Sequence, residues 1–188
     1  MKEKFLEIFR RQVTRRGADK LLEWLESTDF FTAPASTRFH AAYEGGLVEH
    51  SLNVYEVMIA KHFDMEKDDL ESFTIVSLLH DICKAGFYTV DYRNKKNENG
   101  EWEKVPYYTI DDKFPYGHGE KSVFLIERFM RLKNEEAVAI RWHMGGFDDS
   151  AKAGSFTIAT AYEKYPIAVK LHLSDLEATY LHENRSEN

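Results

Sequence analysis

The stretch SLLHDICKAG, residues 77–86, decides how the rest of the chain is interpreted. It is an apolar run that ends in polar groups, because His80 and Asp81 are adjacent and Lys84 follows three residues after the aspartate. Neighbouring residues on a helix lie about 100° apart around the axis, so His80 and Asp81 can lean toward one ion with Lys84 on the same side. A buried helix that finishes on these groups indicates that a polar site lies at its end.

Helical periodicity extends from this stretch in both directions along the chain. Residues 70–84 are expected to form the helix that contains the stretch, with Asp68 or Asp69 as its N-cap. The same spacing of apolar residues predicts helices over 5–9, 18–25, 47–58, 120–131, 135–143 and 167–182.

Residues 87–117 have a different character. The segments FYTVDYRNK and EWEKVPYYTI are rich in aromatic and β-branched residues, and KNENG between them supplies a turn, so one β-hairpin is predicted. The fold class is therefore all-α, a helical bundle with one β-hairpin insertion. We expect a single domain over 1–188, with N-terminal helices over 1–36 and the insertion over 88–117.

Composition narrows the classes of function. A chain of 188 residues with 43% hydrophobic residues can bury a sizeable core in one domain. The formal charge of -7 argues against a protein that coats a nucleic-acid backbone, since neutralisation of phosphates drives that affinity. A small anionic substrate remains compatible with this charge, because bound metal ions reverse the local field.

The cellular compartment is inferred from what the sequence lacks. Cys83 is the only cysteine, so an internal disulfide and a thiolate-rich zinc cluster are excluded and a reducing compartment is favoured. The first residues, MKEKFLEIFRRQ, mix charges with apolar positions, and no run reaches the length of about 18 apolar residues that a bilayer requires. We expect no signal peptide, no membrane partner and a cytoplasmic location.

The histidines carry the chemical signal. Several of the eight follow apolar runs directly, as in GGLVEH, IVSLLHD and AIRWH, and neutral imidazole together with carboxylate is a good ligand set for divalent transition metals. The residues that form an ordered series are His50, His80, Asp81, His118, His143 and Asp175.

This H, HD, H, H, D order resembles the HD superfamily of metal-dependent phosphohydrolases, and the match runs from about residue 38 to residue 180. It includes the glycine pair before His50 and the lysine of HDxxK, which is Lys84. The sequence is particularly similar to bacterial and phage HD-domain hydrolases. It is more distantly similar to the HD part of small bacterial 3′-to-5′ exonucleases, although it lacks their added nucleic-acid-binding barrel.

The resemblance implies a helical HD fold that holds one or two divalent ions, with Mn, Fe, Ni, Co and Zn all compatible. His50, His80, Asp81 and Asp175 would be the core ligands. The two further histidines, His118 and His143, would hold a second ion, and Asp81 would bridge the pair. Asp81 and Lys84 are the predicted catalytic residues.

The activity implied is hydrolysis of a phosphomonoester or phosphodiester of a nucleotide or short oligonucleotide by a metal-activated water. The predicted partner is a small phosphorylated substrate, with short single-stranded nucleic acid as a second possibility. Two other functions stay open: a catalytically inactive HD domain that binds a nucleotide or a partner protein, and an oxygenase, which the basic residues near the site disfavour. Oligomeric state is left open.

Residues near the ligands in sequence are the candidates for substrate contacts. Arg38, Lys121 and Arg141 are predicted to bind phosphate, or else to form ordinary ion pairs. Tyr116, with Tyr107, Tyr108 and Phe114, is a candidate to stack on a base or to cover the core. The remaining side chains are given structural interpretations: His172 as a packed histidine, Cys83 as a core residue, and His40, His62 and His182 as residues without a role.

Overall fold

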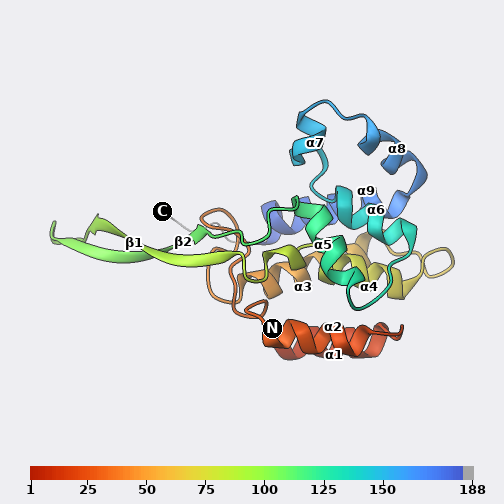
Figure 1. Cartoon of the computed structure of the whole chain (residues 1–188), viewed down its shortest axis with the longest axis horizontal. Helices are drawn as coiled ribbons and strands as arrows, with labels where there is room; N and C mark the ends of the chain where they lie inside the picture. The colour runs from red at the N-terminus through yellow and green to blue at the C-terminus, as the bar shows by residue number, and fades with distance from the viewer. Residues whose placement is uncertain (184–188) are drawn as a thin grey trace.

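The computed structural model describes residues 1–183, and its centre is a pair of helices, α3 (Gly46–His62) and α4 (Leu70–Leu79). Every residue of α4 from Ser72 to Leu79 is buried, which follows from a segment that holds only apolar residues and small hydroxyl residues on all its sides. The Asp69 carboxylate caps α4 by accepting from the backbone N–H of Glu71, as the sequence predicts. Against this pair pack α6 (Asn134–Trp142) and α9 (Pro166–Glu177), which also contact each other, and α5 (His118–Glu127) packs against α6 (Figure 1).

The remaining elements cover the edges of this bundle. In Figure 1, α1 (Lys2–Gln12) and α2 (Ala18–Ser27) lie along one side of the body, and α7 (Asp149–Lys152) and α8 (Thr157–Lys164) lie on the opposite side. Three short turns complete the order: the 3-10 turns η1 (Ile82–Lys84) and η2 (Gly145–Phe147) and the π-helical turn η3 (Ala178–His182).

A buried ion-pair network fastens the N-terminal helices to the bundle. The Arg15 guanidinium donates to both carboxylate oxygens of Glu136 on α6, at 2.7 and 2.8 Å, and also to Glu71 at the start of α4. Glu136 is fully buried and accepts a further bond from Ser72. Because removal of one partner would leave a buried charge uncompensated, this network fixes where the segment after α1 lies against α4 and α6.

Several helix ends differ from the prediction, such as that of α5, which ends at Glu127 instead of residue 131, and two of the differences lie near the site. The expected helix over 70–84 ends at Leu79, and Asp81 has φ −103° and ψ 16° before η1 begins. In a continued helix the Ser77 carbonyl would accept from the N–H of residue 81, whereas here the His80 ring bonds it at 2.8 Å. The second difference concerns 167–182, where α9 ends at Glu177 and η3 widens the last turn.

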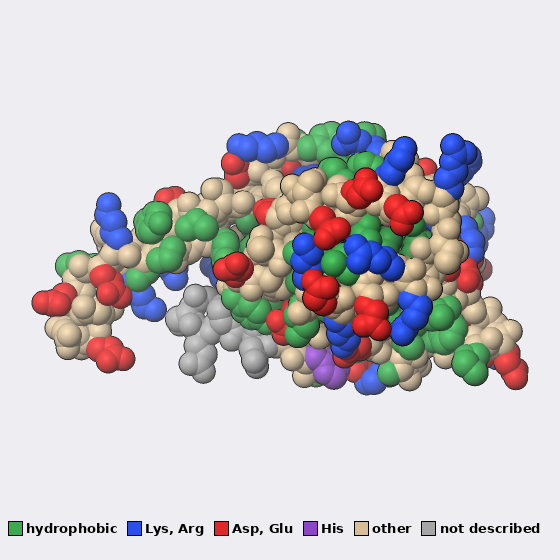
Figure 2. All heavy atoms as spheres, turned by 90° about the horizontal axis from the view of Figure 1, so that it is seen from below, with side chains coloured by type: hydrophobic (Ala, Val, Ile, Leu, Met, Phe, Trp, Pro, Cys, Tyr) green, Lys and Arg blue, Asp and Glu red, His purple; other side chains and the backbone are tan. Residues whose placement is uncertain are grey.

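The predicted hairpin is present. β1 (Tyr88–Lys96) pairs antiparallel with β2 (Trp102–Ile110), in a register that runs without a bulge from Tyr88↔Ile110 to Lys96↔Trp102. It projects from the helical body, as Figures 1 and 2 show. A mostly helical domain with one hairpin is therefore confirmed. Within residues 1–183, no helix combines the length and the apolar character that crossing a membrane would require.

Candidate metal centre

Five helices each deliver side chains to one point near the middle of the bundle. The predicted ligands are His50 on α3, His80 and Asp81 after the end of α4, His118 at the start of α5, His143 after the end of α6, and Asp175 on α9. The structure brings all of them together. His50, His80, Asp81 and His143 are buried, and Asp175 and His118 border the cavity described below.

Two of the histidines are oriented by the helices that they terminate. His80 Nδ1 lies 2.8 Å from the carbonyl of Ser77, and His143 Nδ1 lies 2.6 Å from the carbonyl of Ile140, each three residues earlier in the chain. Since a carbonyl only accepts, each Nδ1 is the donor in this bond. The helix ends thus turn the Nε2 atoms of both rings toward the centre of the bundle.

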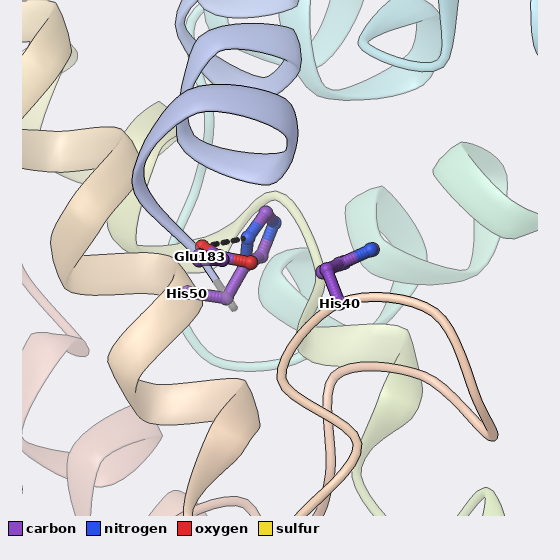
Figure 3. Close-up of side chains that lie close together, drawn as sticks. All are labelled: His40, His50 and Glu183. Atoms are coloured by element: carbon purple, nitrogen blue, oxygen red, sulfur yellow. Dashed lines mark hydrogen bonds and ion pairs between the residues drawn. The ribbon is translucent and has the colours of Figure 1, made fainter. Parts of the chain in front are cut away.

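His50 is oriented by a carboxylate instead. Its Nδ1 donates to Glu183 Oε1 at 2.8 Å (Figure 3). Asn53 Nδ2 donates to the same oxygen at 3.2 Å. Its Nε2 lies 3.1 Å from His80 Nε2 and 3.3 Å from Asp175 Oδ1. A carboxylate–histidine pair of this kind fixes the ring and increases its basicity as a metal ligand.

Asp81 faces two groups of ligands with its two oxygens. Oδ2 lies 3.6 Å from His50 Nε2 and 2.6 Å from the Lys84 ammonium. Oδ1 lies 2.8 Å from His118 Nε2 and 3.5 Å from His143 Nε2. One carboxylate therefore joins the His50 side of the centre to the His118 side.

The donor set fits divalent metal ions. Within the described residues, four overlapping groups have ligand atoms within 4.8 Å of one another: His50, His80 and Asp81; His80, His143 and Asp175; Asp81, His118 and His143; and His40, His50 and Glu183. Nε2 of His143 is buried and has no hydrogen-bond partner in the part of the chain that the structure describes, and burial of such a group is costly. A cation at this position would satisfy that nitrogen.

Protons occupy part of the centre when no metal is bound. Burial opposes the charged form of His50, but Asp175 and Glu183 outweigh it and raise its pKa to about 10. Burial also opposes the charged form of His118, but Cys83 and Asp81 outweigh it and raise its pKa to about 10. Burial dominates at His80 and lowers its pKa to about 3. Lys84 and His80 together outweigh burial to hold the pKa of Asp81 well below its usual value.

A cavity of about 760 Å³ opens onto this cluster. His50, Asp81, His118 and Asp175 form part of its wall, with Lys84 beside them. Its other lining residues are mostly apolar or aromatic and include Phe39, Tyr88, Ile110, Phe147, Leu176 and Tyr180. A ligand in this cavity would touch the metal ligands at one end and apolar surface elsewhere.

The structure gives other partners to two of the predicted phosphate-binding residues. Lys121 is buried, bonds Asp112 at 2.6 Å and is not among the cavity residues. Arg141 pairs with Glu120 and Asp148 and also lies outside the cavity. The reason is geometric for Arg141, because residues two apart on a helix point to opposite sides and His143 takes the inward one.

The other two predicted substrate residues lie at the periphery. Tyr116 is half exposed and stacks on Phe114, in a shallow surface hollow that it shares with Arg141. Arg38 is exposed, with its guanidinium over the Phe39 ring, and only its neighbours in sequence line the cavity. Contact of these residues with a substrate stays a prediction.

Sequence reasoning missed two residues, His40 and Glu183. The ring of His40 lies 5.0 Å from that of His50 and lines the cavity, and its Nε2 is buried with no hydrogen-bond partner among residues 1–183 (Figure 3). Burial, with the nearby His50, lowers its pKa to about 4. Its loop reaches α3 because Gly46 has no side chain: a Cβ there would lie 1.9 Å from the Ala41 carbonyl oxygen. The spacing of His40 before the glycine pair was the available signal.

His172 is packed as expected, since its Nδ1 donates to the His143 carbonyl at 2.6 Å, although it also borders the cavity. Cys83 is buried, with its sulfur 3.4 Å from His118 Nδ1. His62 and His182 do not line the cavity.

Comparison with known proteins gives one family. A family model described as HD domain matches residues 47–175, which is more than half of the chain and extends from the start of α3 to Asp175. All six predicted ligands lie within that span. Searches of curated proteins and of solved structures found no match, so the closer similarity to phage hydrolases or exonucleases stays a prediction.

Proposed function

The chain belongs to the HD domain family, whose members are in general metal-dependent phosphohydrolases, and we propose that it hydrolyses a phosphoester of a nucleotide or short oligonucleotide. The observation that carries this proposal is the convergence of the His50, His80 and His143 Nε2 atoms on two carboxylates. The other nitrogen of each of these rings is already bonded to a carbonyl or carboxylate. Such an arrangement is prepared for metal ligation and has little purpose as core packing.

Two ions are proposed because the ligand groups divide around Asp81. One group contains His50 and His80, the other contains His118 and His143, and Asp81 offers a separate oxygen to each. A bridging carboxylate of this kind is how two cations are held close together without mutual repulsion becoming prohibitive. When bound, the ions would activate a water molecule for attack on phosphorus and stabilise the charge on the departing oxygen.

Lys84 has the substrate-binding role at this centre. Its side chain borders the cavity, and Asp81 outweighs burial to raise its pKa, so the ammonium stays charged. It stands beside the metal ligands and can donate to a phosphate oxygen while remaining bonded to Asp81. A fixed cation at this point stabilises the negative charge that grows on a phosphoryl group during transfer.

The size of the cavity favours a nucleotide over a larger substrate at the end of the cavity that the metal ligands border. A volume of about 760 Å³ lies within the range of small-molecule sites. Phe39, Tyr88 and Tyr180 supply aromatic surface on which a base can rest.

Metal analysis combined with a substrate screen tests the proposal. Purified protein is assayed for bound metal, and nucleotides, cyclic dinucleotides and a chromogenic phosphodiester are offered with Mn²⁺, Fe²⁺, Ni²⁺, Co²⁺ or Zn²⁺. We expect about two ions per chain and turnover of at least one substrate. Asp81→Asn and His80→Gln should lose both metal and turnover, whereas His62→Ala, outside the cavity, should keep both.

The opposite result would identify the alternative function. Tight nucleotide binding with no turnover under any of these metals would contradict hydrolysis and establish an inactive HD domain that binds a nucleotide. Full turnover by Asp81→Asn at equal metal loading would show that the cluster is not the active centre.

A further inference from the structure

One face of the β-hairpin carries aromatic, apolar and basic side chains outward from the cavity. Residues opposite each other in an antiparallel pair point to the same side, and side chains alternate along each strand. The register therefore assigns ten positions to this face, which are Tyr88, Val90, Tyr92, Asn94, Lys96, Trp102, Lys104, Pro106, Tyr108 and Ile110. We call it the aromatic face.

The aromatic face is continuous with the cavity. Tyr88 and Ile110 are its innermost pair, and both line the cavity beside the metal centre. The Tyr88 hydroxyl donates to the Ala35 carbonyl at 3.1 Å, which fixes the base of the hairpin against the loop before α3. A molecule that lies along this face is thus led to the metal ligands.

The charges on the two faces differ. Within the paired residues 88–96 and 102–110, the aromatic face has Lys96 and Lys104 and no acidic side chain. Asp91 and Glu103 both belong to the opposite face. At the base, burial and the Glu44 carboxylate of the neighbouring loop raise the pKa of Tyr108, so one negative charge lies near the inner end of this face.

The outer side chains are exposed and ready for contact. Tyr92 is 63% exposed and Trp102 is 69% exposed, and the Lys96 ammonium lies 5.3 Å from the Trp102 ring centroid. Figure 2 shows the hairpin clear of the body, with hydrophobic side chains on its surface next to basic ones. An exposed aromatic flanked by lysines offers a base-stacking platform with phosphate donors beside it.

We propose that the aromatic face binds a single-stranded oligonucleotide whose end enters the cavity. This inference rests on the proposed function and specifies its substrate class. A nine-residue strand is about 30 Å long at the usual rise per residue, which is much longer than a mononucleotide. The overall charge of -7 and the presence of only two lysines indicate that stacking, rather than phosphate neutralisation, supplies most of the affinity.

The affinity of the full chain for labelled oligothymidylates, measured in the presence of a chelator, tests binding by the aromatic face without any need for turnover. Affinity should increase from the dinucleotide to about the tetranucleotide and beyond. Tyr92→Ala and Trp102→Ala should each weaken binding of the octanucleotide about tenfold. Tyr107→Ala, an aromatic residue of the same hairpin on the opposite face, is the matched control and should change it less than about twofold.

Salt dependence provides the second readout. For single strands the slope of log affinity against log salt is about −0.7 for each phosphate contact, so two lysines predict a shallow slope of about −1.4. Lys96→Gln and Lys104→Gln should each reduce it by about 0.7, while Lys95→Gln on the opposite face should not.

Unchanged octanucleotide affinity in the Tyr92→Ala/Trp102→Ala double variant would overturn the inference. The inference would also fail if the double variant converted a dimer to a monomer without loss of octanucleotide affinity, because the aromatic face would then be an interface between two copies of the chain. Hydrolysis of the chromogenic phosphodiester by the wild-type chain is measured separately. Binding of oligonucleotides by the aromatic face without hydrolysis would contradict the proposed function alone. Hydrolysis without binding by the aromatic face would contradict this inference alone.

Discussion

The buried histidine cluster and the projecting hairpin border the same cavity, but their side chains are held in different ways. In the cluster the Nδ1 atoms of three rings have fixed partners, which are the Glu183 carboxylate for His50, the Ser77 carbonyl for His80 and the Ile140 carbonyl for His143. On the hairpin, backbone pairing fixes the strands while Tyr92 and Trp102 are mostly exposed to solvent. A change in the cluster therefore acts on its neighbours, whereas a change on the hairpin stays local.

Lys84 is the position at which this contrast predicts the largest effect. Lys84→Met should reduce turnover by about 10²- to 10³-fold, because a charged donor to the phosphoryl group is removed. Metal content should be unchanged or higher, since the ammonium that competes with cations for Asp81 Oδ2 is gone. Steady-state kinetics and metal analysis on the same preparation measure the two effects.

Lys170→Met is the matched control, because Lys170 pairs with Asp68 at 2.6 Å and does not line the cavity. Its turnover should equal that of the wild-type chain. Loss of metal from Lys84→Met would mean that Lys84 supports the ligands instead of the substrate.

Substitution of Glu183 should have the next largest effect, which is on metal affinity. Glu183→Gln keeps the shape but weakens the bond to His50 Nδ1, and loss of such a partner typically costs 10- to 100-fold in metal affinity. Competition with a chromogenic chelator measures that affinity independently of activity. Glu177→Gln, a carboxylate earlier in the same C-terminal segment, should have no effect on it, and equal losses in both variants would show a general disturbance of this segment.

Glu183 and His40 also show where sequence reasoning reaches its limit. The ligands from His50 to Asp175 belong to a pattern with fixed chemistry, and the helices that carry them follow from apolar periodicity, so both could be predicted. Glu183 reaches His50 across 133 positions only because η3 redirects the chain after α9. That proximity is a product of tertiary packing and leaves no local pattern.

Proximity along the chain is a weaker guide to the site than the ligand pattern. Lys121 and Arg141 are predicted phosphate-binding residues because they lie close to His118 and His143 in the sequence. Arg141 lies on the side of α6 that faces away from the cavity and pairs with Asp148, and Lys121 pairs with Asp112. Nearness in sequence predicts nearness to a site only when the helical phase agrees as well.

The pH dependence of metal binding gives the third prediction. His50 and His118 have their pKa values raised to about 10 in the metal-free chain, so each carries a proton at pH 7 to 9 that an incoming ion must displace. They belong to different ligand groups, so about one proton should be released for each ion, and affinity should rise about tenfold per pH unit. Calorimetry in buffers of different ionisation enthalpy counts the protons. No proton release at pH 8 would show that both rings are already neutral.

The smallest effect is expected for the stability of the hairpin variants. Tyr92→Ala and Trp102→Ala remove cross-strand contacts and, for Trp102, the Lys96 ammonium over its ring, which together stabilise an exposed hairpin by less than about 1 kcal/mol. Leu79→Ala, a fully buried change at the end of α4, should instead cost about 2–5 kcal/mol. Denaturant unfolding measures both. A loss above about 2 kcal/mol at Tyr92 or Trp102 would mean that these rings pack as core residues, and the division between a fixed cluster and a locally held binding face would no longer hold.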